Sequence, residues 1–194
     1  MRRIWVLFFT LVLTLVGCSG STLTTLKVDL ASFIAAQGFD SGEVSPASGT
    51  VYLPAGEDGR ADLPDGGQLV QLPSLEVLER AAITVRLNLT NQGTASTSFS
   101  IAVYIAPDSE SNIYQETYRV GQTAQLLLAA GETGPLELVL ALSETENLEA
   151  FNRVRAGRFR VGLRLDSGGG TVAYTVTTAE VSVSGRLFAL IPDA

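Results

Sequence analysis

Strict alternation of apolar and polar side chains is the feature that most constrains the fold of this 194-residue chain. It is clearest from Ile83 to Thr90 and returns from Ser98 to Ile105 and from Arg158 to Leu165. A two-residue period places successive side chains on opposite faces of an extended backbone. These runs therefore predict half-buried β-strands and a mainly β protein.

The first two runs are separated by Asn91-Gln92-Gly93. Two alternating runs around a glycine-containing turn are typical of an antiparallel hairpin. We therefore expect residues 83–105 to form a hairpin within one sheet.

The rest of the chain predicts further short strands and one helix. The expected strands are 26–34, 50–53, 113–119, 124–128, 136–142, 172–176 and 181–190. Ser143 and Glu146 have the spacing of a capping box and Gly157 suits a helix end, which predicts a short helix near 145–156. Seven or more strands with regular turns favour an antiparallel two-sheet sandwich.

The pattern from Ile83 to Ile105 resembles strands of immunoglobulin-like modules found outside bacterial cells. The resemblance implies an immunoglobulin-like order of strands. The cysteine pair and core tryptophan of antibody domains are missing from this chain.

The amino terminus has the composition of an export signal. Arg2 and Arg3 precede an uncharged apolar run, Ile4 to Val16, which is shorter than the roughly 20 residues of a membrane-spanning helix. The run ends in Leu15-Val16-Gly17-Cys18, which resembles the lipobox of bacterial lipoproteins. An ordinary signal peptide with an incidental cysteine, or an uncleaved helical anchor, is the alternative interpretation.

The lipobox resemblance implies cleavage after Gly17, a diacylglyceryl thioether on Cys18, and an acyl chain such as palmitate on the new amino terminus. Ser19, where family members kept in an inner membrane carry Asp, implies an outer membrane or cell surface. We therefore expect a removed signal at 1–17, a lipidated tether at 18–25 and one sandwich domain at 26–194. Several acyl chains anchor a protein stably where one does not.

Composition narrows the classes of function. Histidine is absent and Cys18 is the only cysteine, so a Ser-His-Asp relay, a Cys-His relay and a histidine-ligated metal are excluded. Loss of Arg2 and Arg3 with the signal changes the formal net charge from −7 to −9, which opposes binding to nucleic acid. A carboxylate-only hydrolase stays formally open. We expect a non-enzymatic protein without a cofactor.

Two groups of charged residues are candidate sites. Asp58, Asp62 and Asp65 follow the pattern D-G-x-x-D-x-x-D, similar to the tail of aspartate-rich calcium loops. Gly56 stands where such loops have their leading aspartate, and a solvated acidic turn is the favoured alternative.

Arg158, Arg160 and Arg164 share one face of a predicted strand and are candidates for binding an anion, such as a lipid phosphate or a sugar acid. The favoured alternative is the polar side of an amphipathic strand. Tyr104, Tyr114 and Tyr118 suggest a sugar-stacking surface, although tyrosine is also an ordinary strand residue.

The sequence thus predicts a membrane-anchored binding or scaffold module of the cell envelope, whose partner is another envelope protein or surface component. The alternative is a small-ligand receptor in which the irregular segment 37–73 forms a lid. A pocket beneath that segment would favour the receptor, and exposed apolar loop tips would favour the scaffold.

Overall fold

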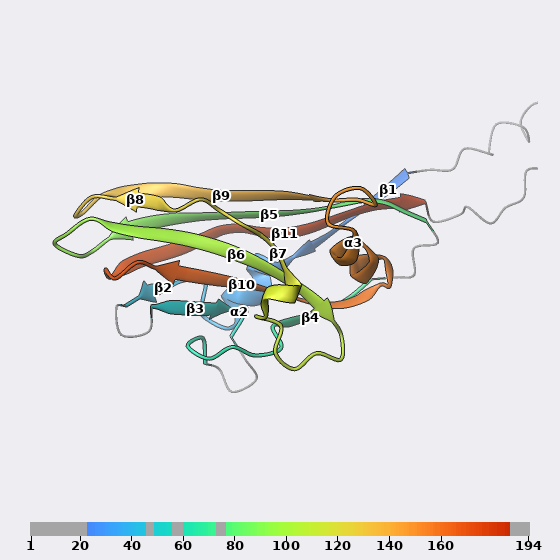
Figure 1. The fold of residues 1–194 in the computed structure, drawn as a ribbon, viewed down its shortest axis with the longest axis horizontal. Coiled ribbons are helices and arrows are strands. Elements are labelled where there is room, and N and C mark those ends of the chain that lie inside the picture. Colours follow the sequence, from blue (N-terminus) through green and yellow to red (C-terminus); the bar gives the residue numbers. More distant parts are fainter. Residues whose placement is uncertain (1–22, 46–48, 56–59, 73–76, 187–194) are drawn as a thin grey trace, which may run out of the picture.

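The computed structural model describes residues 23–45, 49–55, 60–72 and 77–186. In these residues two antiparallel β-sheets pack against each other as an elongated sandwich (Figure 1). The first sheet has the order β1 (Leu23–Asp29), β11 (Val172–Arg186), β5 (Val77–Asn91) and β9 (Thr133–Leu142), with β2 (Ser41–Val44) also paired to β11. The second has the order β3 (Thr50–Leu53), β10 (Arg158–Ser167), β6 (Thr97–Pro107) and β7 (Arg119–Gln122), with β4 (Gln68–Gln71) on β10 and β8 (Leu126–Leu128) on β6.

The expected mainly β, antiparallel two-sheet sandwich is confirmed. The order of its strands is that of a jelly roll: β1 lies beside the last strand, and the chain changes sheet at β2–β3, β4–β5, β5–β6, β8–β9, β9–β10 and β10–β11. This order differs from the ABED and CFG sheets of an immunoglobulin domain, so it refines the expected type of sandwich.

The core lies between the two inner faces. The alternating residues of β5 point inward as expected, with exposed fractions of 0 to 1% for Ile83, Val85, Leu87 and Leu89. The inward residues of β6 and β10 are buried to the same extent. Period-two alternation therefore identified the core side of each long strand.

The expected hairpin at residues 83–105 is wrong. β5 and β6 are consecutive, but β5 pairs with β11 and β9, whereas β6 pairs with β10, β7 and β8. The connection 92–96 crosses between the sheets, which pack about 10 Å apart in a sandwich. Alternation is the same whether two strands share a sheet or face each other, so the pattern could not distinguish the two arrangements.

The predicted strand 26–34 stops early. β1 begins at Leu23, inside the segment expected to be a tether, and ends at Asp29, where helix α2 (Leu30–Ala36) begins. The Asp29 carboxylate caps the helix by accepting from the Ser32 N–H at 3.2 Å and its hydroxyl at 2.5 Å, and these bonds lower the Asp29 pKa. Leu30 and Ile34, four residues apart, are the buried positions of the helix.

The predicted strand 113–119 is also wrong. Residues 108–118 form a loop with a short 3-10 helix, η2 (Glu116–Tyr118), that covers part of the outer face of β6. Ile113 of this loop is fully buried with Ala102, Tyr104 and Ala106. β6 is therefore covered on both faces, which explains its burial from Phe99 through Ala106.

Most of the remaining predicted elements differ in their ends, whereas the predicted strands 172–176 and 181–190 belong to one continuous strand, β11, with 187–190 outside the described residues. Strand 50–53 matches β3, 124–128 shortens to β8, and 136–142 lengthens to β9. The predicted helix is α3 (Leu148–Arg155), which ends at Gly157 in a left-handed conformation, φ +76°. Ser143 accepts from the Glu146 N–H at 3.0 Å, one turn before the helix, so the capping-box residues form a turn of their own.

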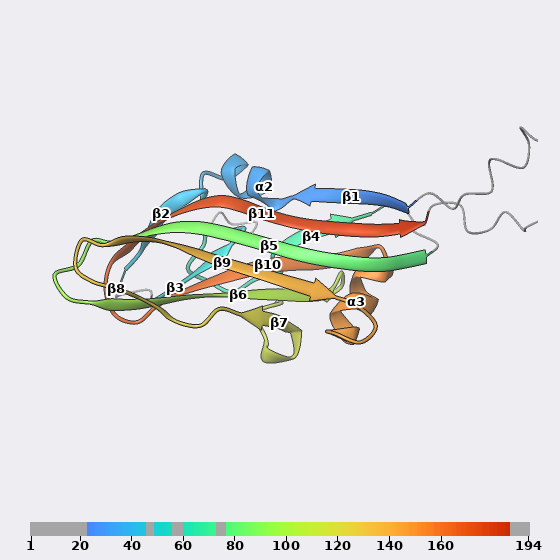
Figure 2. The ribbon, with the colours of Figure 1, turned by 90° about the horizontal axis from the view of Figure 1, so that it is seen from above.

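The long strands give the sandwich two distinct ends. β1 begins opposite the last residue of β11, and α3 lies toward the same end (Figures 1 and 2). The loops β5–β6, β8–β9 and β10–β11 gather at the opposite end, which we call the distal end.

Asn91 ties the distal loops together. Its buried side-chain amide donates to the carbonyl oxygens of Ala95, Leu128 and Ala129 at 2.8–3.0 Å, and its Oδ1 accepts from the Gly93 N–H at 2.8 Å. The neighbouring Gln92 N–H donates to the Thr171 carbonyl of the third loop at 2.9 Å. A buried amide with all of its partners satisfied stabilises one arrangement of the loops.

We predict that Asn91→Ala lowers the free energy of unfolding by about 2–3 kcal/mol, because buried carbonyl groups lose their donor. Gln92→Ala is the matched control, since the Gln92 side chain is exposed. Urea unfolding followed by circular dichroism measures both variants, and equal stabilities would contradict the role given to Asn91.

Tyr174 makes the free energy of unfolding depend on pH in the alkaline range. Its ring packs over Gly42, and burial, with a smaller contribution from the Asp40 charge, raises its pKa to about 12. A phenol titrates near 10 in the unfolded chain, so the folded state favours the protonated form. The stability that the protonated Tyr174 contributes is fully present below about pH 10 and is lost as the pH rises to about 12.

We therefore predict that Tyr174→Phe flattens the fall in stability between about pH 10 and 12. Urea midpoints measured across this range test the prediction, with Tyr52→Phe as a tyrosine control in the other sheet. An equal alkaline loss in Tyr174→Phe and the unsubstituted protein would contradict it.

Candidate functional site

Both sheets have an outer edge that is shared by two short strands. In one sheet β11 pairs with β1 and then β2, and α2 fills the interval between them. In the other sheet, β10 pairs with β4 up to Val161 and with β3 from Leu163. The chain therefore leaves this edge after Leu53 and returns at Gln68, and we call residues 54–67 the excursion. The two interrupted edges lie on the same side of the sandwich (Figure 2).

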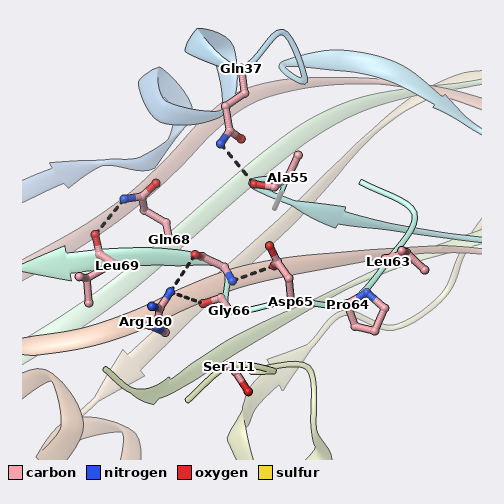
Figure 3. Close-up of a pocket in the computed structure, with 11 residues that line it drawn as sticks. Gln37, Ala55, Leu63, Pro64, Asp65, Gly66, Gln68, Leu69, Ser111 and Arg160 are labelled. Atoms are coloured by element: carbon pink, nitrogen blue, oxygen red, sulfur yellow. Dashed lines mark hydrogen bonds between the residues drawn. The ribbon is translucent and has the colours of Figure 1, made fainter. Parts of the chain in front are cut away.

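A hollow of about 710 Å³ opens where these two interruptions meet. Figure 3 shows Gln37, the residue after α2, at the top, Leu63 and Pro64 at the right, and Gln68 and Leu69 of β4 at the left. Asp65, Gly66, Gly67, Ala55, Ser111 and Arg160 complete the lining. The lining mixes apolar side chains with amide, hydroxyl, carboxylate and guanidinium groups, as ligand sites do.

Arg160 supports the floor of the hollow. Its Nε donates to the Asp108 carbonyl at 2.9 Å, and its Nη1 donates to the carbonyls of Gly66 and Gly67 at 3.2 and 3.4 Å. Within the described ranges it has no carboxylate partner. Arg160 therefore holds the backbone at Gly66 and Gly67 in place, and its Nη2 can donate to another acceptor.

Gln37 and Gln68 are each held by a hydrogen bond from the side-chain nitrogen. Gln37 donates from Nε2 to the Ala55 carbonyl at 3.2 Å, and Gln68 donates from Nε2 to the Leu69 carbonyl at 2.8 Å. No partner for either Oε1 occurs among the described residues. Both amides are thus held in place while an acceptor oxygen on each stays available.

Gly67 lets the excursion lie close to the sheet. It has φ +56°, and an added Cβ would lie 2.5 Å from Ile113 Cδ1 and 2.6 Å from the Val161 carbonyl oxygen. The Gly67 N–H donates to the Asp65 carboxylate at 2.8 Å, and the Asp65 carbonyl accepts from Ile113. This turn joins the excursion, β10 and the 108–118 loop.

The candidate calcium ligands are not placed together. Asp58 lies outside the described residues, Asp62 pairs with Arg60 at 2.8 Å, and Asp65 accepts from Gly67. The bonds from Arg60 lower the pKa of the Asp62 carboxyl. No group of three metal-ligating side chains occurs in the described part of the chain, and the calcium site stays a prediction because Asp58 belongs to it.

The candidate anion-binding arginines have separate partners. Arg158 pairs with Asp108 at 2.8 Å and Arg164 pairs with Asp166 at 2.9 Å, whereas Arg160 lines the hollow. The three lie on the outer face of β10 as expected. An anion would have to compete with a carboxylate at Arg158 and Arg164.

The tyrosines do not form the expected stacking surface. Tyr104 is fully buried, with the Tyr114 ring at 5.3 Å and the Arg164 guanidinium 5.6 Å from its ring centroid. Burial raises the pKa of Tyr104, and its hydroxyl has no hydrogen-bond partner in the described structure. Tyr118 donates to Glu110 at 2.7 Å, at the other end of the loop.

Sequence reasoning did not find Gln37, Gln68, Ser111 or Leu63. They come from α2, β4 and two separate loops, and none belongs to a motif with diagnostic spacing. The only signal was the unusual length of the irregular segment 37–73, which predicted a functional region but not its residues.

No family model and no curated protein matches the chain. A solved structure of infectious bursal disease virus, Gx strain, is 10% identical over 85% of this chain and 33% of its own, with a TM-score of 0.38. A chain described as "CBM4 structure and function" is 9% identical over 61% of this chain and 59% of its own, with a TM-score of 0.32.

A third solved structure, the CBM22-1–GH10 modules of Clostridium thermocellum xylanase 10B with xylohexaose, is 11% identical over 76% of this chain and 28% of its own, with a TM-score of 0.34. This chain thus spans about a third of the viral chain. The class that the architecture defines is a jelly-roll β-sandwich. No helix in the described ranges is both long and apolar enough to cross a bilayer.

We predict that Gly67→Ala destabilises the protein by about 2–4 kcal/mol, because left-handed strain adds to a clash with backbone. Gly38→Ala separates the two effects: Gly38 also has positive φ, +77°, but an added Cβ meets nothing within 4 Å. Strain alone should cost Gly38→Ala about 1 kcal/mol. Thermal and urea unfolding measure both variants, and equal losses would contradict the close approach at Gly67.

Proposed function

We propose that the protein is a lipid-anchored, non-enzymatic binding module of a bacterial cell envelope. The single observation that carries the binding part is the hollow of about 710 Å³, lined largely by residues of the segment 37–69. A pocket at this segment is the feature expected of the small-ligand receptor rather than of the scaffold.

The segment itself is less of a lid than the sequence suggested. It contributes β2, β3 and β4, which are paired to β11 and β10, and only its loops border the hollow. The proposed module therefore binds at a largely preformed surface on its side.

The anchoring part of the proposal comes from Cys18 and the residues before it, which lie outside the described residues. The position of β1 fits it. Leu23 is five residues from Cys18, so lipid on Cys18 would hold the start of β1 within roughly 20 Å of the membrane surface. The distal loops would then point away from the membrane.

The non-enzymatic part rests on chemistry. The chain has no histidine, and its only cysteine is the proposed lipid site. The hollow has one carboxylate, Asp65, in its lining, whereas hydrolysis by carboxylates needs a facing pair.

We predict that Cys18→Ala abolishes incorporation of a clickable palmitate analogue in a bacterial host and moves the protein from the membrane fraction to the soluble fraction. Ser19→Ala is the matched control and keeps both properties. Membrane retention of Cys18→Ala after a high-salt wash would contradict lipid anchoring, whatever the hollow binds.

A further inference from the structure

We propose that the hollow binds a saccharide, whose hydroxyl groups are recognised by Gln37, Gln68, Ser111 and Arg160. The inference rests on the proposed function and names the class of ligand. It follows from the groups that the protein's own hydrogen bonds leave available and from the apolar surface beside them.

The available acceptors are amide oxygens. Gln37 and Gln68 each donate from Nε2 to a backbone carbonyl, so Oε1 of each side chain can accept a hydrogen bond from a ligand. These groups call for a ligand that donates hydrogen bonds.

The available donors belong to Arg160 and Ser111, which line the same hollow. Arg160 commits Nε and Nη1 to carbonyls, and Nη2 has no acceptor among the described residues. The Ser111 hydroxyl also lacks a partner in the described structure and can donate or accept. The same ligand must therefore accept as well as donate.

A sugar hydroxyl does both, which favours it over the simpler charged ligands. A sulfate or a fully ionised phosphate has no proton to donate to the two amide oxygens and would meet the Asp65 charge. An ammonium ion would meet the Arg160 guanidinium. A neutral, polyhydroxylated ligand matches all of these groups at once.

Apolar side chains also line the hollow. Leu63 is 46% exposed there, and Pro64 and Leu69 belong to the same lining. Such a surface suits the C–H face of a pyranose, whose apolar surface is removed from water when it packs there.

A peptide is the competing occupant. Strand-type peptide recognition uses the row of free N–H and C=O groups on a sheet edge. Here the carbonyls of Gly66 and Gly67 already accept from Arg160, and the groups that remain are side-chain groups gathered at one point. The observations therefore favour the saccharide.

The test uses the full mature chain in mild detergent, labelled with ¹⁵N. Hexasaccharides of β-1,4-glucose, α-1,4-glucose, β-1,4-xylose and β-1,4-N-acetylglucosamine are titrated one at a time to millimolar concentration. We expect at least one to shift the backbone signals of Gly66 and Gly67 and the side-chain amide signals of Gln37 and Gln68.

Gln37→Leu and Gln68→Leu keep the bulk of each side chain and remove its hydrogen bonds. We expect each to weaken binding by about fivefold and the pair by about twentyfold, the effect of one and two hydrogen bonds. Gln125→Leu is the matched control on an exposed residue between β7 and β8 and should leave affinity unchanged.

Three results would overturn the inference: no shift with any of the four saccharides, shifts confined to residues away from the hollow, or equal affinity in the double variant and the Gln125→Leu control. Shifts at Gly66 and Gly67 with an uncharged peptide rich in Phe and Leu, without any from the saccharides, would assign the hollow to a peptide instead. Palmitate labelling at Cys18 is scored on the same preparations, so loss of the saccharide assignment is distinguishable from loss of the proposed anchoring.

Discussion

Backbone hydrogen bonding at the outer edges of the two sheets is the constraint on which the rest of this structure depends. β10 and β11 are each completed on one side by two short strands instead of one long strand. Buried N–H and C=O groups in the interruptions still require partners. The Asp40 carbonyl supplies one in the interruption beside β11 by accepting from the Val176 N–H at 2.7 Å, and the Ala61 carbonyl covers the outer edge of β3 by accepting from the Tyr52 N–H at 2.7 Å. The interruptions are thus closed by a helix and a loop, and the hollow is the space that these two leave between them.

The same constraint explains which parts of the fold the sequence could predict. Long strands with one face in the core, such as β5 and β10, carry a two-residue period that depends only on that burial. Strand pairing depends on two segments at once. The sequence of a connection such as 92–96 does not indicate whether the connection closes a hairpin or crosses between sheets. The strand predicted at 26–34 was wrong for a different reason. Leu26, Val28 and Leu30 have the two-residue spacing of a strand, whereas Leu30 and Ile34 have the four-residue spacing of a helix. The local bond from Ser32 to Asp29 favours the helix there.

The candidate site was less predictable than the fold, again for a physical reason. Arginines on an amphipathic strand look equivalent in the sequence, but their roles depend on which acceptors the topology places opposite them. Arg158 meets the Asp108 carboxylate, whereas Arg160, two residues later, meets three backbone carbonyls. Tyr104 looked like a surface residue because it occupies the outward side of its strand, and it became buried when the 108–118 loop folded over that side. Neither outcome is encoded within the local pattern.

The position of the hollow along the sandwich gives the anchoring proposal a mechanical consequence. Strands of 15 residues, such as β5 and β11, span roughly 50 Å, and Arg160 lies in the part of β10 that pairs with β4. Under the proposed anchoring, a tether of five residues keeps the start of β1 close to the bilayer, while the hollow lies along the side of the sandwich where the two interrupted edges meet. A site in this position meets ligands that lie parallel to the membrane without requiring them to reach the lipid. The rigid distal end, held by Asn91, then stays free for contacts of its own, so binding at the side and contact at the tip need not compete.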